Sequence, residues 1–197
     1  DFLFRSSISF NMLFLEEIWS RNFTNLFIAP LKVSEIITSL TVTALIRTLI
    51  GIVPAILLAS PFFGVSIFNL GLPLVLLLLS LYAFGMTLGL LVISGLLRYG
   101  PAFENVAWSS LFLLAPLGCI YYPLSILPDW LQIIAKMLPL VYIFEEVRSI
   151  LLNSIVNYSN IMSAFILNFI YFLLSVFVFY RSFHEARKRG TLINVGE

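Results

Sequence analysis

The sequence predicts an all-α protein whose helices cross a membrane several times and form a single domain over residues 1–197. Its composition is the first reason, because 60% of the residues are hydrophobic and only 11% are charged, against roughly 45–50% and about 25% in typical soluble domains. The second reason is a mean hydropathy of +1.04. The third is that no charged residue lies between Arg47 and Arg98, an apolar region long enough for two spans of about 20 residues each.

The first apolar stretch, residues 2–15, has too few residues for a complete span, which needs about 20. We interpret it as the end of an earlier span. The chain begins with Asp1 rather than Met, so we expect the first span and most of the second to be missing from it.

Residues 11–29 predict an amphipathic helix that lies along the membrane surface. Large apolar side chains recur there at spacings of three and four residues, and charged side chains occupy another face, a pattern typical of interfacial helices. The helix is either a plain anchor or a docking surface for a cytosolic partner. Its apolar face comprises Met12, Leu15, Trp19, Phe23 and Leu26, and its polar face includes Glu16, Glu17 and Arg21.

Prolines and glycines divide the rest of the apolar sequence into separate helices. We predict complete spans over residues 33–60, 70–97, 105–122 and 155–180. With the partial span at the start, this gives a bundle of four complete spans and one partial span.

Residues 127–148 are too charged to cross a bilayer and too apolar for water. Two prolines in this stretch can each open a short helix, because a proline in the first turn has no N–H that the helix needs. We therefore expect a re-entrant hairpin, whose irregular backbone requires cover by protein or a watery cavity, and we interpret it as an outward gate. The candidate residues of this gate are Pro128, Trp130, Pro139, Tyr142, Glu145 and Arg148.

Within the second hairpin helix, Glu145 and Arg148 are three residues apart and can pair on one face. An exposed pair contributes only about 0–1 kcal/mol. The pair is either a surface feature without a role or a contact that fixes the hairpin, for example by bonding to backbone near Pro139. Glu146 points to another side of the helix and is expected to be solvated.

The distribution of Lys and Arg predicts the orientation of the chain. Lys136 and Arg148 lie on the side of the hairpin, which we expect to face outward, and the C-terminus is expected in the cytoplasm. Arg5 and Arg47 fall within or near spans, where each either snorkels to an interface or lines the interior of the bundle. The predicted cytoplasmic side carries Arg21, Lys32, Arg98, Arg181, Arg187, Lys188 and Arg189.

The sequence carries no motif for catalysis. It has no phosphate-binding loop of the form G-x-x-x-x-G-K-[ST] and no H-E-x-x-H. The sole histidine, His184, and the sole cysteine, Cys119, are far apart, which argues against a transition-metal site. We therefore predict that the chain is not an enzyme and binds no metal, cofactor or nucleic acid itself.

Two segments, taken together, resemble the type-2 ABC transporter permeases, the membrane subunits of bacterial exporters. The sequence FLEEIWSRN at residues 14–22 is similar to the cytoplasmic coupling helix of that family. The Tyr-Pro pair at 122–123, LPDWLQ at 127–132 and Leu-Pro at 138–139 are similar to its outer hairpin.

This resemblance implies a six-span subunit in the cell (plasma or inner) membrane that works as a homodimer or with a paired permease. Two cytosolic ATPase subunits would bind ATP and Mg and push the coupling helix, and substrate would leave outward past the hairpin. In that role Glu16, Glu17 and Arg21 would contact the ATPase, beside Asn22, while Trp19 would face the spans.

Two other classes of protein stay open. A secondary transporter or channel-like protein would need no ATPase, but its coupling commonly uses acidic residues inside the membrane, and the spans after Thr48 have almost none at mid-depth. A membrane-embedded enzyme would need a convergent catalytic set. The pattern of Leu and Phe does not identify the substrate.

Overall fold

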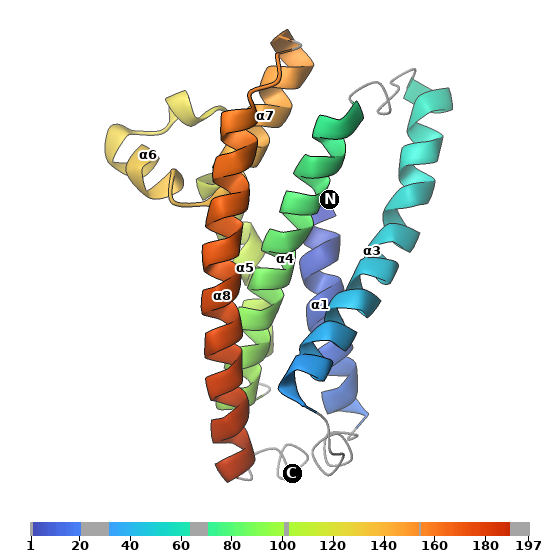
Figure 1. The fold of residues 1–197 in the computed structure, drawn as a ribbon, viewed down its shortest axis with the longest axis vertical. Helices are drawn as coiled ribbons and strands as arrows, with labels where there is room; N and C mark the ends of the chain where they lie inside the picture. The colour runs from blue at the N-terminus through green and yellow to red at the C-terminus, as the bar shows by residue number, and fades with distance from the viewer. Residues whose placement is uncertain (1, 21–31, 64–70, 101–102, 154, 190–197) are drawn as a thin grey trace.

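The computed structural model of this protein describes residues 2–20, 32–63, 71–100, 103–153 and 155–189 (Figure 1). Within these ranges all regular secondary structure is helical, which confirms the predicted all-α class. The helices are α1 (Phe2–Trp19), α3 (Val33–Phe63), α4 (Gly71–Tyr99), α5 (Glu104–Leu117), α6 (Asp129–Ala135), α7 (Pro139–Asn153) and α8 (Tyr158–Arg189), with a 3₁₀ turn, η3 (Leu124–Ile126), before α6.

Among the described residues, three helices are long and apolar enough to cross a membrane, namely Val33–Leu58 within α3, all of α4, and Tyr158–Lys188 within α8. They confirm three of the four predicted spans. The fourth, over residues 105–122, was predicted too long, because α5 has only 14 residues and a span needs about 20. Shortly after α5 ends, Cys119 adopts a left-handed backbone conformation with a φ of 54°, which an α-helix cannot continue.

Helix α1 is one continuous helix, so the predicted change of element at Asn11 does not occur. Residues 11–19, expected to lie along the membrane surface, continue the helix that packs against α3 and α4. The physical reason is that Phe10 and Phe14, which stand on either side of the predicted boundary, share one buried face of a single helix. The rest of the predicted surface helix, residues 21–29, lies outside the described part of the chain.

Helix α4 forms the centre of the bundle. In the most apolar segment of α4, 67% of the residues are buried, whereas the corresponding fraction is 24% in α3 and 22% in α8. It packs against both α1 and α8 (Figure 1). Helix α1 approaches α4 closely at Gly85 and Gly89, since a Cβ at Gly85 would collide with Ser6 and a Cβ at Gly89 would lie 2.8 Å from Phe10. These two glycines therefore form the small-residue face that lets two helices of a membrane bundle touch.

Replacing Gly89 with leucine is expected to lower the yield and melting temperature of the folded protein. The new side chain would force α1 away from α4, and overpacking of this kind costs about 1–3 kcal/mol. Leu79→Phe enlarges a side chain that is exposed on the same helix and serves as the matched control. Thermal unfolding of both purified variants measures the difference, and equal melting temperatures would contradict the close contact.

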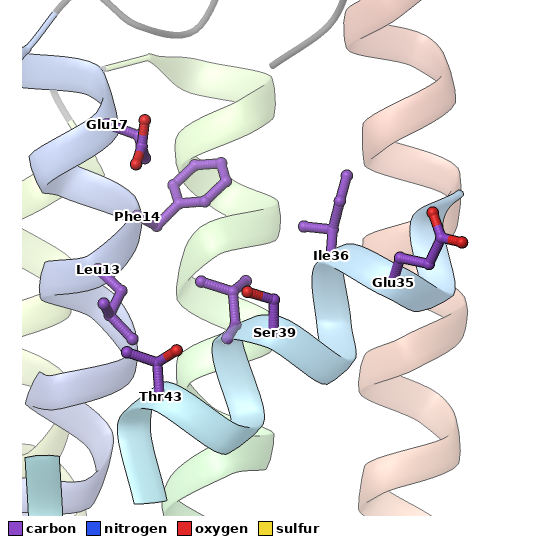
Figure 2. Close-up of a pocket in the computed structure, with 8 residues that line it drawn as sticks. Leu13, Phe14, Glu17, Glu35, Ile36, Ser39 and Thr43 are labelled. Carbon is purple, nitrogen blue, oxygen red and sulfur yellow. The ribbon is translucent and has the colours of Figure 1, made fainter. Parts of the chain in front are cut away.

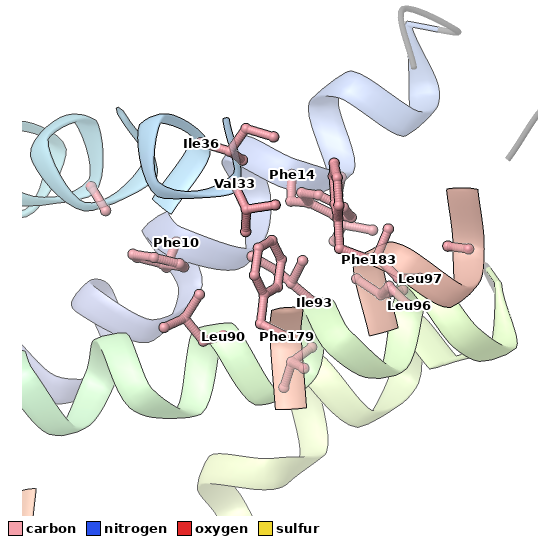
Figure 3. Close-up of a cluster of buried hydrophobic side chains, with 14 residues drawn as sticks. Phe10, Phe14, Val33, Ile36, Leu90, Ile93, Leu96, Leu97, Phe179 and Phe183 are labelled. Atoms are coloured by element: carbon pink, nitrogen blue, oxygen red, sulfur yellow. The ribbon is translucent and has the colours of Figure 1, made fainter. Parts of the chain in front are cut away.

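The largest buried apolar cluster joins α1, α3, α4 and α8 near the end of the bundle at which α8 terminates (Figure 3). We call this the basic end, because the adjoining ends of the helices carry Lys32, Arg98, Arg187 and Lys188. The opposite end, which includes residues 118–153 and 155–157, is the hairpin end. The labelled residues of the cluster are Phe10, Phe14, Val33, Ile36, Leu90, Ile93, Leu96, Leu97, Phe179 and Phe183.

Candidate functional site

The hairpin end contains the two short helices that the prolines predicted. Pro128 immediately precedes α6, and its carbonyl accepts the backbone N–H groups of Leu131 and Gln132 at 2.8 and 3.0 Å. Pro139 is the first residue of α7. Helix α6 stands off to the side of the bundle in Figure 1, and the hydroxyl of Tyr171 on α8 donates to the carbonyl of Met137 at 3.1 Å. This hydrogen bond links the turn after α6 to α8.

Glu145 and Arg148 form a clamp between α7 and the chain that precedes α6. The Arg148 Nη1 group donates to Glu145 Oε1 at 2.7 Å, and the same oxygen accepts the backbone N–H of Leu124 at 2.7 Å. Arg148 Nη2 donates to the carbonyl of Cys119 at 3.1 Å. The Arg148 side chain is only 24% exposed and that of Glu145 only 31% exposed. The bonds to backbone therefore exist, but they fall at η3 and the turn after α5, rather than near Pro139.

The prediction that Glu146 is solvated is wrong. Its side chain is fully buried. Its carboxylate accepts the backbone N–H of Asn157 at 2.6 Å and the side-chain amide of Asn160 at 3.0 Å. Both donors stand at the start of α8, where a carboxylate also meets the positive end of the helix dipole. Glu146 therefore fastens α7 to the first turn of α8.

A signal for this burial was present in the sequence. Ile143 lies three residues before Glu146 and Pro139 seven residues before it, so all three share one helical face. The structure buries that face as a whole. A carboxylate on the apolar face of a short amphipathic helix is a candidate for a buried hydrogen-bonded group.

A cavity of about 480 Å³ lies between η3, α6, α7 and the first turn of α8. Of the predicted gate residues, Tyr142 and Glu145 line it, whereas Trp130 does not and is 65% exposed. The cavity therefore presents groups that both donate and accept hydrogen bonds. Its polar lining is Ser125, Gln132, Lys136, Tyr142, Glu145 and Asn160.

At the basic end, Glu16 and Arg47 join α1 to α3. The two terminal guanidinium nitrogens of Arg47 donate to the two carboxylate oxygens of Glu16 at 2.9 and 2.8 Å. Paired, bidentate contacts of this kind are the stronger form of an ion pair. Arg47 thus bonds across the α1–α3 contact. The Arg47 side chain is 42% exposed and that of Glu16 is 50% exposed, so the pair stands at the edge of the bundle.

A second cavity, of about 330 Å³, lies between α1 and α3 (Figure 2). Its lining includes Phe14 and Glu17 of α1 and Glu35 and Ile36 of α3. Trp19 was expected to face the spans, but it is 55% exposed. The predicted partners Arg21 and Asn22 lie outside the described residues.

No group of three or more His, Cys, Asp or Glu side chains that could hold a metal ion occurs among the described residues. A family model described as ABC-2 type transporter matches residues 2–152. No curated protein matches the chain, and no solved structure does. The matched region includes both ends of the bundle, with the Glu16–Arg47 pair at one and the clamp at the other.

Proposed function

This chain belongs to the ABC-2 type transporter family, and from this premise we propose that it is the membrane-spanning permease of an exporter driven by ATP. The observation that carries the proposal is the family match over residues 2–152. The long apolar helices agree with a multi-pass membrane protein. The ATP and Mg would be bound by a separate cytosolic ATPase subunit, and a second permease would complete the pathway.

In this proposal the basic end faces the cytoplasm and receives the ATPase. The described part of the coupling segment is the end of α1, with Glu16, Glu17 and Trp19, and Arg21 and Asn22 would continue it. Trp19 is exposed there, as a contact residue requires. Because α1 packs against both α3 and α4, a push on its end would move these helices relative to one another.

The hairpin end would then be the outward exit. Support comes from the cavity beside α6, whose lining includes the polar side chains of Tyr142 and Glu145. The clamp and Glu146 hold the hairpin against α5 and α8, so a shift of α8 would be passed to the exit.

Purification of the full-length subunit from its native membrane tests the proposal directly. We expect an ABC-type ATPase to co-purify, and its ATP hydrolysis in lipid vesicles to change when the exported substrate is present. If the chain instead supports ion-gradient-driven flux without any ATPase, the secondary-transporter alternative replaces the proposal.

The orientation is tested separately by single-cysteine labelling in a variant with Cys119→Ala. An impermeant thiol reagent added outside intact cells is expected to label Lys136→Cys and to leave Lys188→Cys unlabelled. The reverse pattern would overturn both the orientation and the role of the hairpin as an exit.

A charge exchange tests whether the Glu16–Arg47 pair transmits movement from α1 to α3. Glu16→Arg alone places two cations together and is expected to reduce transport per ATP hydrolysed severalfold. Glu16→Arg combined with Arg47→Glu restores the pair in reverse and is expected to recover coupling. If the exchanged pair stays uncoupled, Glu16 acts through the ATPase and not through Arg47.

A further inference from the structure

Two buried polar side chains of α1 lack hydrogen-bond partners within the part of the chain that the structure describes. Ser7 is completely buried, and Asn11 is 2% exposed. The Ser7 hydroxyl and both the oxygen and the nitrogen of the Asn11 amide have no partner. Since the residues are four apart, they stand on one face of the helix. Three polar atoms are thus shut away from water without compensation.

Most other buried polar side chains in the described part of the bundle make at least one hydrogen bond; Asn168, whose side-chain oxygen also has no partner, still donates through its nitrogen. The Asn168 amide nitrogen of α8 donates to the carbonyl and the hydroxyl of Ser80 on α4, both at 2.8 Å. The hydroxyls of Thr48 and Ser94 donate to the carbonyl four residues earlier in their own helices. An unmade hydrogen bond in a dry interior is costly, and most buried polar groups avoid it.

Apolar packing nevertheless holds α1 in this place. Phe10 stands between Ser7 and Asn11 in sequence, is fully buried, and touches α4 where Gly89 has no side chain. The same ring belongs to the apolar cluster near the basic end (Figure 3). Phe10 therefore stabilises this position of α1, whereas the unpaired polar groups of Ser7 and Asn11 destabilise it.

We propose that α1 has a second position in the protein, in which water reaches Ser7 and Asn11, and that their unpaired groups keep the two positions close in free energy. A ligand or partner then needs little differential affinity to shift the population between them. The use of this shift in export rests on the function proposed above, whereas the existence of the second position does not.

The first test compares two buried asparagines in the full-length protein. Ser7→Ala and Asn11→Leu remove unpaired groups and are expected to raise the melting temperature. Asn168→Leu removes an amide whose nitrogen makes two hydrogen bonds to Ser80, and is expected to lower it. If Asn11→Leu lowers the melting temperature as much as Asn168→Leu does, Asn11 is bonded in the folded protein and the proposal fails. Asn11→Ala, which adds no bulk, separates this outcome from simple overpacking.

The second test measures access of water during turnover. In a Cys119→Ala background, Ser7→Cys is expected to react with a small water-soluble thiol reagent at least tenfold faster with ATP and the partner ATPase than without them. Ser175→Cys, buried on α8, is the control and is expected to stay unreactive. Equal and slow labelling at both positions would overturn the second position.

The outcomes also separate this inference from the proposed function. If labelling of Ser7→Cys is fast but does not depend on ATP, the second position exists and the proposed coupling to an ATPase is wrong. If ATP changes labelling at Trp19→Cys, at the end of α1, but never at Ser7→Cys, the coupling stands and the second position does not.

Discussion

Replacing Glu146 with leucine is expected to lower the melting temperature of the protein by several degrees and to reduce the yield of correctly folded material. The substitution removes the buried acceptor of the Asn157 N–H and of the Asn160 amide. Hydrogen bonds to a charged group contribute about 1.5–3 kcal/mol each. The expected consequence is that α7 detaches from the start of α8, so that the hairpin loses its anchor.

Two further variants separate this role from a general effect of removing a carboxylate. Glu146→Gln keeps the shape and one acceptor oxygen, so it should lose less stability than the leucine variant. Glu185→Gln removes a carboxylate from the pair with Arg181, a contact of 3.5 Å in which Arg181 is 72% exposed, and such pairs contribute about 0–1 kcal/mol. Thermal unfolding in the same detergent measures all three. If the Glu146→Leu variant has the same melting temperature as the parent protein, the carboxylate of Glu146 is hydrated and does not hold α8.

The general architecture was readable from the sequence because the bilayer imposes a simple rule of length and polarity. The interval without charge between Arg47 and Arg98 could only be filled by two spans separated by a turn, and the structure has α3 and α4 there. Pro128 and Pro139 marked the starts of α6 and α7 because proline restricts where a helix can begin. These signals are local, and tertiary contacts did not change them.

The errors arose where tertiary contacts decide. An apolar face such as that of Phe10 and Phe14 is expected both in a helix on the membrane surface and in a helix buried in the bundle. Only the contact of α1 with Gly85 and Gly89 shows that α1 is buried. The partners of Glu146 come from residues 11 and 14 positions further along the chain, beyond the reach of helical periodicity. The same holds for the clamp, whose backbone acceptor at Cys119 lies 29 residues from Arg148.

Replacing Arg148 with glutamine is expected to lower export about tenfold or more while insertion into the membrane stays intact. The change removes the ion pair with Glu145 and the bond to the Cys119 carbonyl, so the turn after α5 loses its link to α7. Hydrogen bonds of charged groups contribute about 1.5–3 kcal/mol, and about 1.4 kcal/mol corresponds to a tenfold change in rate. Export from cells that contain equal amounts of parent and variant measures the effect.

Glu145→Gln is expected to have a smaller effect, because glutamine can still accept the Leu124 N–H that the carboxylate binds. The double variant should lose little more than Arg148→Gln alone, since the two side chains act through one shared contact. Trp130→Ala is the control at the same end of the bundle, because Trp130 is exposed and does not line the cavity. If Arg148→Gln exports at the parental rate and Trp130→Ala does not, the exit is controlled from the exposed face of α6, and the clamp has no part in transport.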